Sequence, residues 1–180
     1  MRILLGAIAA GLLLTVLAVG WATQTDRLAQ GYAPAQPIPF SHRLHAGSLS
    51  IPCLHCHSAA DRSRHAGIPA VEVCMECHRV TKTESPAIVQ LKALFDSGRP
   101  LEWKRVHSLP DHVYFDHRPH VNAGVDCRSC HGPVEDMTVI SQAMSLRMNR
   151  CLACHRAPRP SLPAESDLQR APENCHACHR

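Results

Sequence analysis

The chain has 180 residues, of which only 4% are aromatic, and its 19 basic and 15 acidic residues give a formal net charge of +4. A chain of this length ordinarily buries one hydrophobic core, and so few aromatic side chains exclude a core rich in them. The sequence contains no Gly-rich nucleotide motif and no nucleophile elbow, which excludes the enzyme classes recognised by those motifs.

The first expected element is a membrane-spanning helix. Residues 3–22 carry no charge, and about 20 residues span roughly 30 Å as a helix, enough to cross a bilayer. The apolar core of a secretory signal is shorter, about 7–15 residues, although Ala18-Val19-Gly20 could be read as a cleavage site. We predict a retained anchor over residues 1–24, with a cleaved signal as the alternative. Arg2 predicts a cytoplasmic N-terminus, so the rest of this single-pass protein lies on the periplasmic side of the inner membrane.

A proline-rich segment, residues 25–39, follows as an extended linker. Every cysteine of the remaining domain, residues 40–180, belongs to a CxxCH unit. The five units are Cys53/Cys56/His57, Cys74/Cys77/His78, Cys127/Cys130/His131, Cys151/Cys154/His155 and Cys175/Cys178/His179.

CxxCH is the attachment signal of c-type haem. The two thiols add to the haem vinyl groups, and the adjacent His becomes the first, or proximal, axial ligand of the iron. Paired cysteines also occur in zinc and dithiol sites, but those sites have no reason to place His after every second Cys. We therefore predict five covalently bound haem c groups.

Five haems in 180 residues determine the expected fold class. The porphyrins supply most of the apolar interior, so the polypeptide is expected to be mainly α-helical and irregular, with low secondary-structure content. Each haem also carries two propionates, and five ferric haems bring the net charge of the loaded protein to roughly −1. The formal positive charge therefore gives no reason to expect nucleic acid as a partner.

The haem domain contains an internal pseudo-repeat, FxHxxH followed by two CxxCH units. The motif covers Phe40–His45 and again Phe115–His120. It divides the domain into halves at about 40–98 and 99–156, and the fifth haem occupies 157–180.

One helix and one extended segment are predicted between the halves. Ser85 suits an N-cap, Pro86 a first turn and Gly98 a helix end, so residues 85–97 are expected to form a packing helix. Residues 101–115 have no clean period and are expected to run extended over haem edges.

Nine histidines lie outside the CxxCH units, and five irons need a second, or distal, axial ligand. We expect this role for the four FxHxxH histidines and one histidine near Trp103. These are His42, His45, His107, His117 and His120. His42 and His117 are expected to serve the first haem of their own halves.

The remaining histidines rank lower as ligands. His65 is a secondary candidate, and His112 follows it. His55 and His176 lie inside CxxC loops, where the geometry makes it awkward to reach another iron.

Methionine is a further candidate ligand in the second half. No histidine lies between His131 and Cys151, and this stretch offers Met137 and Met148, in that order of preference. We expect at least one haem, that of the fourth unit, to have Met opposite its proximal His. Thioether ligation raises the reduction potential, although Met residues also fill irregular gaps.

An iron with two protein ligands has no vacant position for a substrate. We therefore expect electron transfer and no catalytic residues. The absence of a CxxCK unit, which would suggest a lysine-ligated catalytic haem, agrees with this expectation.

Several segments of the chain carry a family signature. They are Pro37–Gly47, Arg64–His78, Glu102–Val121, Cys127–Met137 and Arg147–Arg156. These segments resemble the pentahaem cytochrome c subunit of alternative complex III, a quinol-oxidising respiratory complex. The FxHxxH pattern alone is shared with the class III multihaem cytochromes.

The resemblance implies an electron-transfer subunit that is not itself an enzyme. It would relay electrons from quinol towards a periplasmic cytochrome c, a copper protein or a terminal oxidase. The implied partners are an iron–sulfur/molybdopterin-like subunit, quinol-site membrane subunits and a monohaem cytochrome c.

Two other functions stay open. The first is a stand-alone, single-helix multihaem quinol dehydrogenase, which would turn over quinol as an isolated chain. The second is a soluble pentahaem donor to a nitrite reductase, which requires a cleaved signal.

Overall fold

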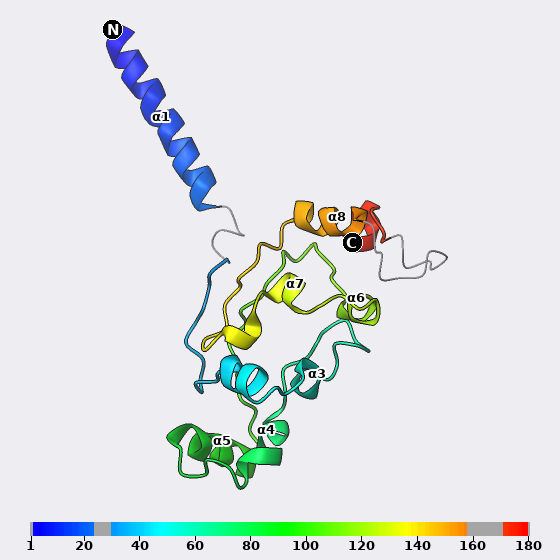
Figure 1. Cartoon of the computed structure of the whole chain (residues 1–180). Helices are drawn as coiled ribbons and strands as arrows, with labels where there is room; N and C mark the ends of the chain where they lie inside the picture. Colours follow the sequence, from blue (N-terminus) through cyan, green and yellow to red (C-terminus); the bar gives the residue numbers. More distant parts are fainter. Residues whose placement is uncertain (1, 24–29, 158–170, 180) are drawn as a thin grey trace.

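The structure, a computed structural model, describes residues 2–23, 30–157 and 171–179. Short helices and irregular segments surround an open middle (Figure 1). Among the described residues, the β-type pairing is one isolated antiparallel bridge between Val113 and His179. The mainly helical and irregular fold expected for this chain is confirmed.

The elements follow one another with short connections. They are α1 (Arg2–Ala22), the π-helix η1 (Arg43–Ser48), α3 (Cys53–Cys56), α4 (Val71–His78), α5 (Pro86–Asp96), α6 (His117–Asn122), α7 (Arg128–His131), the 3-10 helix η2 (Val134–Asp136), α8 (Met148–Arg156) and α9 (Cys175–Cys178). Residues 24–29 of the predicted anchor and linker, and 158–170 of the predicted fifth-haem unit, lie outside the described residues.

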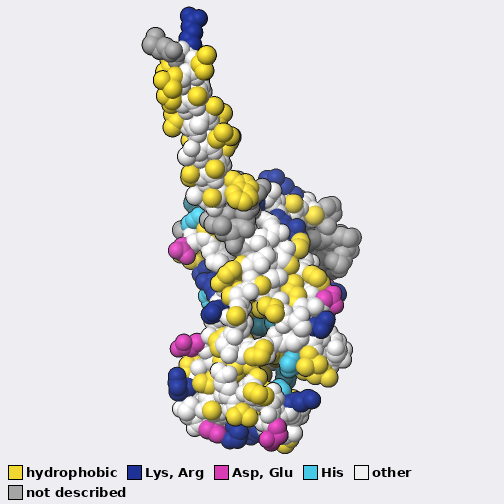
Figure 2. Space-filling model, turned by 90° about the vertical axis from the view of Figure 1, so that its left-hand side faces the viewer, with side chains coloured by type: hydrophobic (Ala, Val, Ile, Leu, Met, Phe, Trp, Pro, Cys, Tyr) yellow, Lys and Arg dark blue, Asp and Glu magenta, His cyan; other side chains and the backbone are white. Residues whose placement is uncertain are grey.

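Helix α1 is apolar on all sides, and none of its residues is buried against the rest of the protein. Hydrophobic side chains cover its whole length (Figure 2). It is long and apolar enough to cross a membrane, as predicted, and a signal sequence near an N-terminus has the same properties.

The proline-rich segment after α1 is extended and hydrogen-bonded to the haem domain. The Gly31 amide donates to the Gln142 carbonyl (2.8 Å), and the Gln142 amide donates to the Tyr32 carbonyl (3.3 Å). The side chain of Gln36 exchanges two hydrogen bonds with the backbone of Lys104, at 2.8 and 3.0 Å. The segment therefore packs as part of the domain from its first described residues.

A small polypeptide core joins α4 and α5. Its buried members are Ile38, Val71, Met75 and Leu91. As predicted, α5 has Ser85 at its N-cap and proline in its first turn. Gly98 follows the helix with φ +63°, a left-handed conformation that favours glycine.

We expect Leu91→Ala to lower the free energy of unfolding by about 2–5 kcal/mol, because it removes a fully packed side chain and leaves a cavity. Leu91 is 4% exposed. Denaturant titration of the haem-loaded protein, followed by circular dichroism, measures the loss.

Val89→Ala is the matched control, since Val89 lies on the same helix and is 54% exposed. It should cost less than about 0.5 kcal/mol. Equal losses from the two variants would contradict the assignment of this core.

Candidate haem-binding sites

Each CxxCH unit lies on or ends a short helix. The five helices are α3, α4, α7, α8 and α9. Side chains three positions apart share one face of a helix, so both cysteines of a unit can reach the same edge of one porphyrin. The sites are numbered here from first to fifth in chain order.

Four proximal histidines have Nδ1 against a backbone carbonyl. A carbonyl acceptor keeps the proton on Nδ1 and leaves Nε2 free for a metal. The contacts are His57 with Gly67 (2.7 Å), His78 with Thr81 (3.0 Å), His155 with Pro172 (2.6 Å) and His179 with His112 (3.2 Å).

The pseudo-repeat of the sequence is also a repeat in space. The Phe40 ring lies edge-on to His42 (centroids 4.9 Å apart) and stacks on His45 (4.4 Å). Phe115 has the same relation to His117 (4.8 Å, edge-on) and to His120 (4.5 Å). Each phenylalanine thus holds two imidazoles in fixed and nearly perpendicular orientations.

Four histidines face the proximal histidine of a CxxCH unit across a gap. The ring centroids are separated by 6.2 Å for His45 and His78, 6.3 Å for His117 and His131, 6.0 Å for His120 and His155, and 5.5 Å for His112 and His179. Metal–imidazole bonds of about 2 Å place the centroids of two rings on opposite sides of one metal about 6 Å apart. The donors therefore fit an iron between each pair.

His42 occupies the repeat position equivalent to His117. Burial lowers its pKa to about 4, and His57 is the neighbour with the largest further effect. Its Nδ1 is buried without a hydrogen-bond partner in the described part of the chain, whereas Nδ1 of His117 faces the Arg64 carbonyl at 2.9 Å. A buried polar atom of this kind calls for a partner outside the polypeptide.

The structure places His107 differently from the ring pairs. Its ring lies 4.5 Å from that of His131 at an interplanar angle of 81°, closer than two ligands on opposite sides of one iron. Its Nε2 is also buried without a hydrogen-bond partner among the described residues, and burial lowers its pKa.

The lower-ranked histidines separate into two groups. His65 and His176 are exposed, and Nε2 of His55 lies 3.7 Å from a carboxylate oxygen of Glu76. His112 instead faces His179. Sequence reasoning undervalued it, although it lies in the same resembling segment as His107.

The methionines lie differently from the arrangement expected at the fourth site. The position opposite His155 is taken by His120, which reaches it from α6. Met148 is 62% exposed at the start of α8, and Met137 is half-buried, its carbonyl accepting from the Arg43 amide at 2.9 Å. The sequence gap without histidine is thus filled in space by a residue from an earlier helix.

The apolar surface around the sites also fits a large hydrophobic cofactor. The buried hydrophobic residues in the described ranges are Ile38, Ala60, Val71, Met75, Leu91 and Val106. Leu49, Leu54 and Ile68, which flank the first site, are 42–60% exposed. Exposed apolar side chains beside unpaired cysteines are the surface that porphyrins would cover.

Comparison with known proteins agrees with these sites. Residues 113–180, which hold the last three CxxCH units, match the family described as cytochrome c7 and related cytochrome c. Over 120 residues, 66% of the chain, the protein is 32% identical to the multihaem cytochrome c subunit of menaquinone reductase from Nitratidesulfovibrio vulgaris Hildenborough. The chain spans about half, 55%, of that relative's length. The attachment sites thus belong to a multihaem cytochrome c domain that is similar to cytochrome c7 in residues 113–180, and its cofactor is covalently bound haem c.

Proposed function

We propose that the protein binds five haem c groups, each with its iron between two histidines. The observation that carries this assignment is the separation of 5.5–6.3 Å between facing imidazole rings. The pairs are His57 with His42, His78 with His45, His131 with His117, His155 with His120 and His179 with His112.

The first pair rests on the repeat, because His42 and His57 correspond to His117 and His131. Burial lowers the pKa of His131 to about 4, as it does for His42. Both rings are therefore neutral at physiological pH and present a lone pair to a metal.

Bound haem supplies a one-electron couple. The polypeptide contributes two imidazoles per site, which leave no open position for a substrate, and carbonyl contacts that fix those rings. This arrangement suits electron transfer between partners and provides no acid, base or nucleophile for substrate chemistry.

The proposed setting is a quinone-linked complex of the inner membrane, with α1 as a retained anchor and the haem domain on the periplasmic side. Within that setting, resemblance favours the pentahaem subunit of alternative complex III, which relays electrons from quinol. Its partners would be iron–sulfur/molybdopterin-like, quinol-site and monohaem cytochrome subunits. Isolation in mild detergent tests this proposal, since the chain should purify with such subunits.

The opposite direction of electron flow is the second candidate, because the curated relative is named as a subunit of a menaquinone reductase. Reduction of the haems by added quinol favours the first function. Oxidation of pre-reduced haems by added menaquinone, with negligible reduction by quinol, favours the second. Quinol turnover by the isolated chain would instead indicate a stand-alone dehydrogenase, and a native N-terminus beyond residue 20 a soluble carrier.

The haem count gives a direct prediction. All ten cysteines lie in CxxCH units, so the denatured protein should exceed the mass of its polypeptide by five haems. Mass spectrometry of intact protein measures this excess. The Cys175→Ala/Cys178→Ala variant is the control, and it should carry one haem fewer. An excess of four haems or fewer in the unaltered chain would contradict the proposal.

A further inference from the structure

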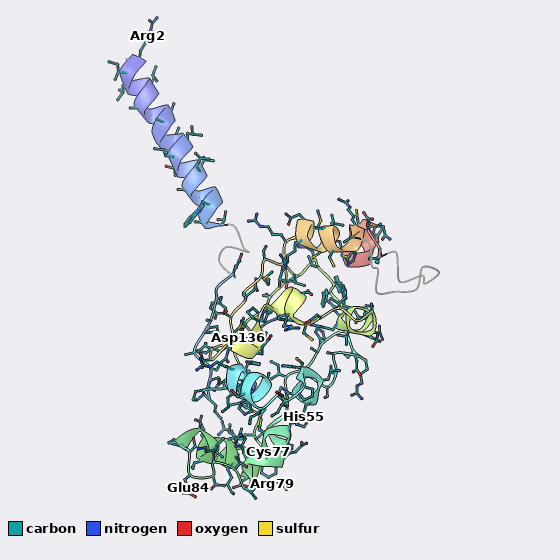
Figure 3. The ribbon with its side chains drawn as sticks, in the orientation of Figure 1. Arg2, His55, Cys77, Arg79, Glu84 and Asp136 are labelled. Atoms are coloured by element: carbon teal, nitrogen blue, oxygen red, sulfur yellow. The ribbon has the colours of Figure 1, made fainter. Side chains whose placement is uncertain are left out.

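The first and second sites are neighbours. His42 and His45, assigned to these two sites, flank the same phenylalanine, Phe40. The helices that carry the cysteines also meet, because Nε2 of His55 in α3 lies 3.7 Å from a carboxylate oxygen of Glu76 in α4. In Figure 3, His55 lies directly above Cys77.

The first site also borders the third. Burial raises the pKa of the Cys127 thiol, and a hydrogen bond with the Cys53 thiol raises it further. The loops around these cysteines are joined by the Asn122 side chain, which donates to the Asp61 carbonyl at 3.1 Å. The two halves of the pseudo-repeat therefore meet through their first sites.

The third and fourth sites repeat the arrangement of the first and second. Phe115 lies against both His117 and His120, which are assigned to these sites. In addition, the Arg150 guanidinium in α8 donates to the Ser129 carbonyl in α7 at 3.3 Å. The Cys130 and Cys154 thiols are close enough for one to raise the pKa of the other.

The fourth and fifth sites meet at the C-terminus. Nδ1 of His155 faces the carbonyl of Pro172 at 2.6 Å, and the Arg156 guanidinium forms an ion pair of 2.8 Å with Glu173. Both contacts join α8 to the strand of chain that leads directly into α9. The Cys151 thiol is in electrostatic reach of Cys178.

From these contacts we infer that the five haem sites form one unbranched row, in the order second, first, third, fourth, fifth. The inference rests on the proposed function, which assigns one haem to each CxxCH unit. The row does not follow chain order, because the two halves join through their first sites. Its terminal members, where electrons enter and leave, are the second and fifth sites.

The two ends of the row lie at opposite ends of the haem domain. Figure 1 shows α8 and the C-terminus at the end nearer α1, and α4 with α5 at the far end. Cys77, Arg79 and Glu84 mark this far end in Figure 3. The fifth site is therefore the membrane-side terminus of the row, and the second site is the terminus for a partner further out.

Deletion of single haems from the full-length, detergent-solubilised holoprotein tests the order. Alanine pairs at Cys53/Cys56, Cys74/Cys77 or Cys175/Cys178 remove the first, second or fifth haem. Reduction potentials of close haems depend on each other's charge, so a missing haem shifts the midpoints of its direct neighbours. Redox titration followed by electron paramagnetic resonance resolves the low-spin signals.

Loss of the first haem should shift two midpoints, and loss of the second or of the fifth should shift one each. Two shifted midpoints after loss of the second haem, or one after loss of the first, would overturn the order. His45→Met and His112→Met keep all haems and serve if a deletion variant does not fold. Each should shift its own haem strongly and one neighbour weakly.

The haem count separates this test from that of the proposed function. Five haems by mass together with a different pattern of shifts would refute the row alone. Fewer than five haems in the unaltered chain would refute the proposed five-haem assignment, whatever the pattern among those that remain.

Discussion

Replacement of His112 by alanine is expected to convert one haem from the low-spin to the high-spin state. His112 faces His179 with ring centroids 5.5 Å apart, and its removal leaves the fifth iron with one protein ligand. A five-coordinate haem is recognisable by a high-spin signal in electron paramagnetic resonance. It would also bind added cyanide or imidazole, which the other sites exclude.

His107→Ala is the discriminating comparison, because the sequence favoured His107 as a ligand. Its ring meets His131 edge-on at 4.5 Å, so this variant should keep every haem low-spin. His65→Ala, at an exposed position, controls for the loss of an imidazole alone. A high-spin haem in His107→Ala, with none in His112→Ala, would reverse the assignment of the fifth distal ligand.

Exchange of residues 1–23 for a cleavable secretory signal is expected to move the protein from the membrane to the soluble fraction. Helix α1 buries no residue against the haem domain, so its removal should leave the domain folded and loaded. About 20 apolar residues provide the entire expected attachment to the bilayer. Fractionation after osmotic release of the periplasm, with haem staining, measures the change.

The unaltered chain in the same fractionation is the reference. A variant that remains in the membrane fraction, with full haem content, would show that partner subunits or another surface retain it. Release of the unaltered chain, with an N-terminus near Trp21, would instead establish that the segment is a signal that is removed.

Local patterns predicted several parts of this structure well. α1 and α5 were predictable because an uncharged run, a capping residue and a terminating glycine act over a few residues. The low secondary-structure content also follows from the motifs, since many porphyrin sites in a short chain replace side-chain packing. The first described residues after α1 were expected as a linker, and hydrogen bonds that link them to Gln142 and Lys104 could not be inferred from composition.

Ligand pairing was harder to infer, because it depends on contacts between distant segments. The FxHxxH motif announces two imidazoles, but only the fold brings His120 from α6 to His155 in α8. Likewise, the segment with both His107 and His112 is irregular, so no periodicity indicates which ring faces a site. The bridge between Val113 and His179 determines that choice for His112.

The sparse polypeptide core has a consequence for how the protein is made. The buried hydrophobic residues of the described ranges are few, and Leu91, Val71 and Met75 lie together under α4 and α5, so most of the chain has little to fold around before its thiols have reacted. A newly exported chain is therefore open to the attachment machinery at every CxxCH unit and equally open to periplasmic proteases. Survival of the chain reports complete maturation, and a shortage of haem in the cell should lower the amount of this protein instead of yielding rows with gaps.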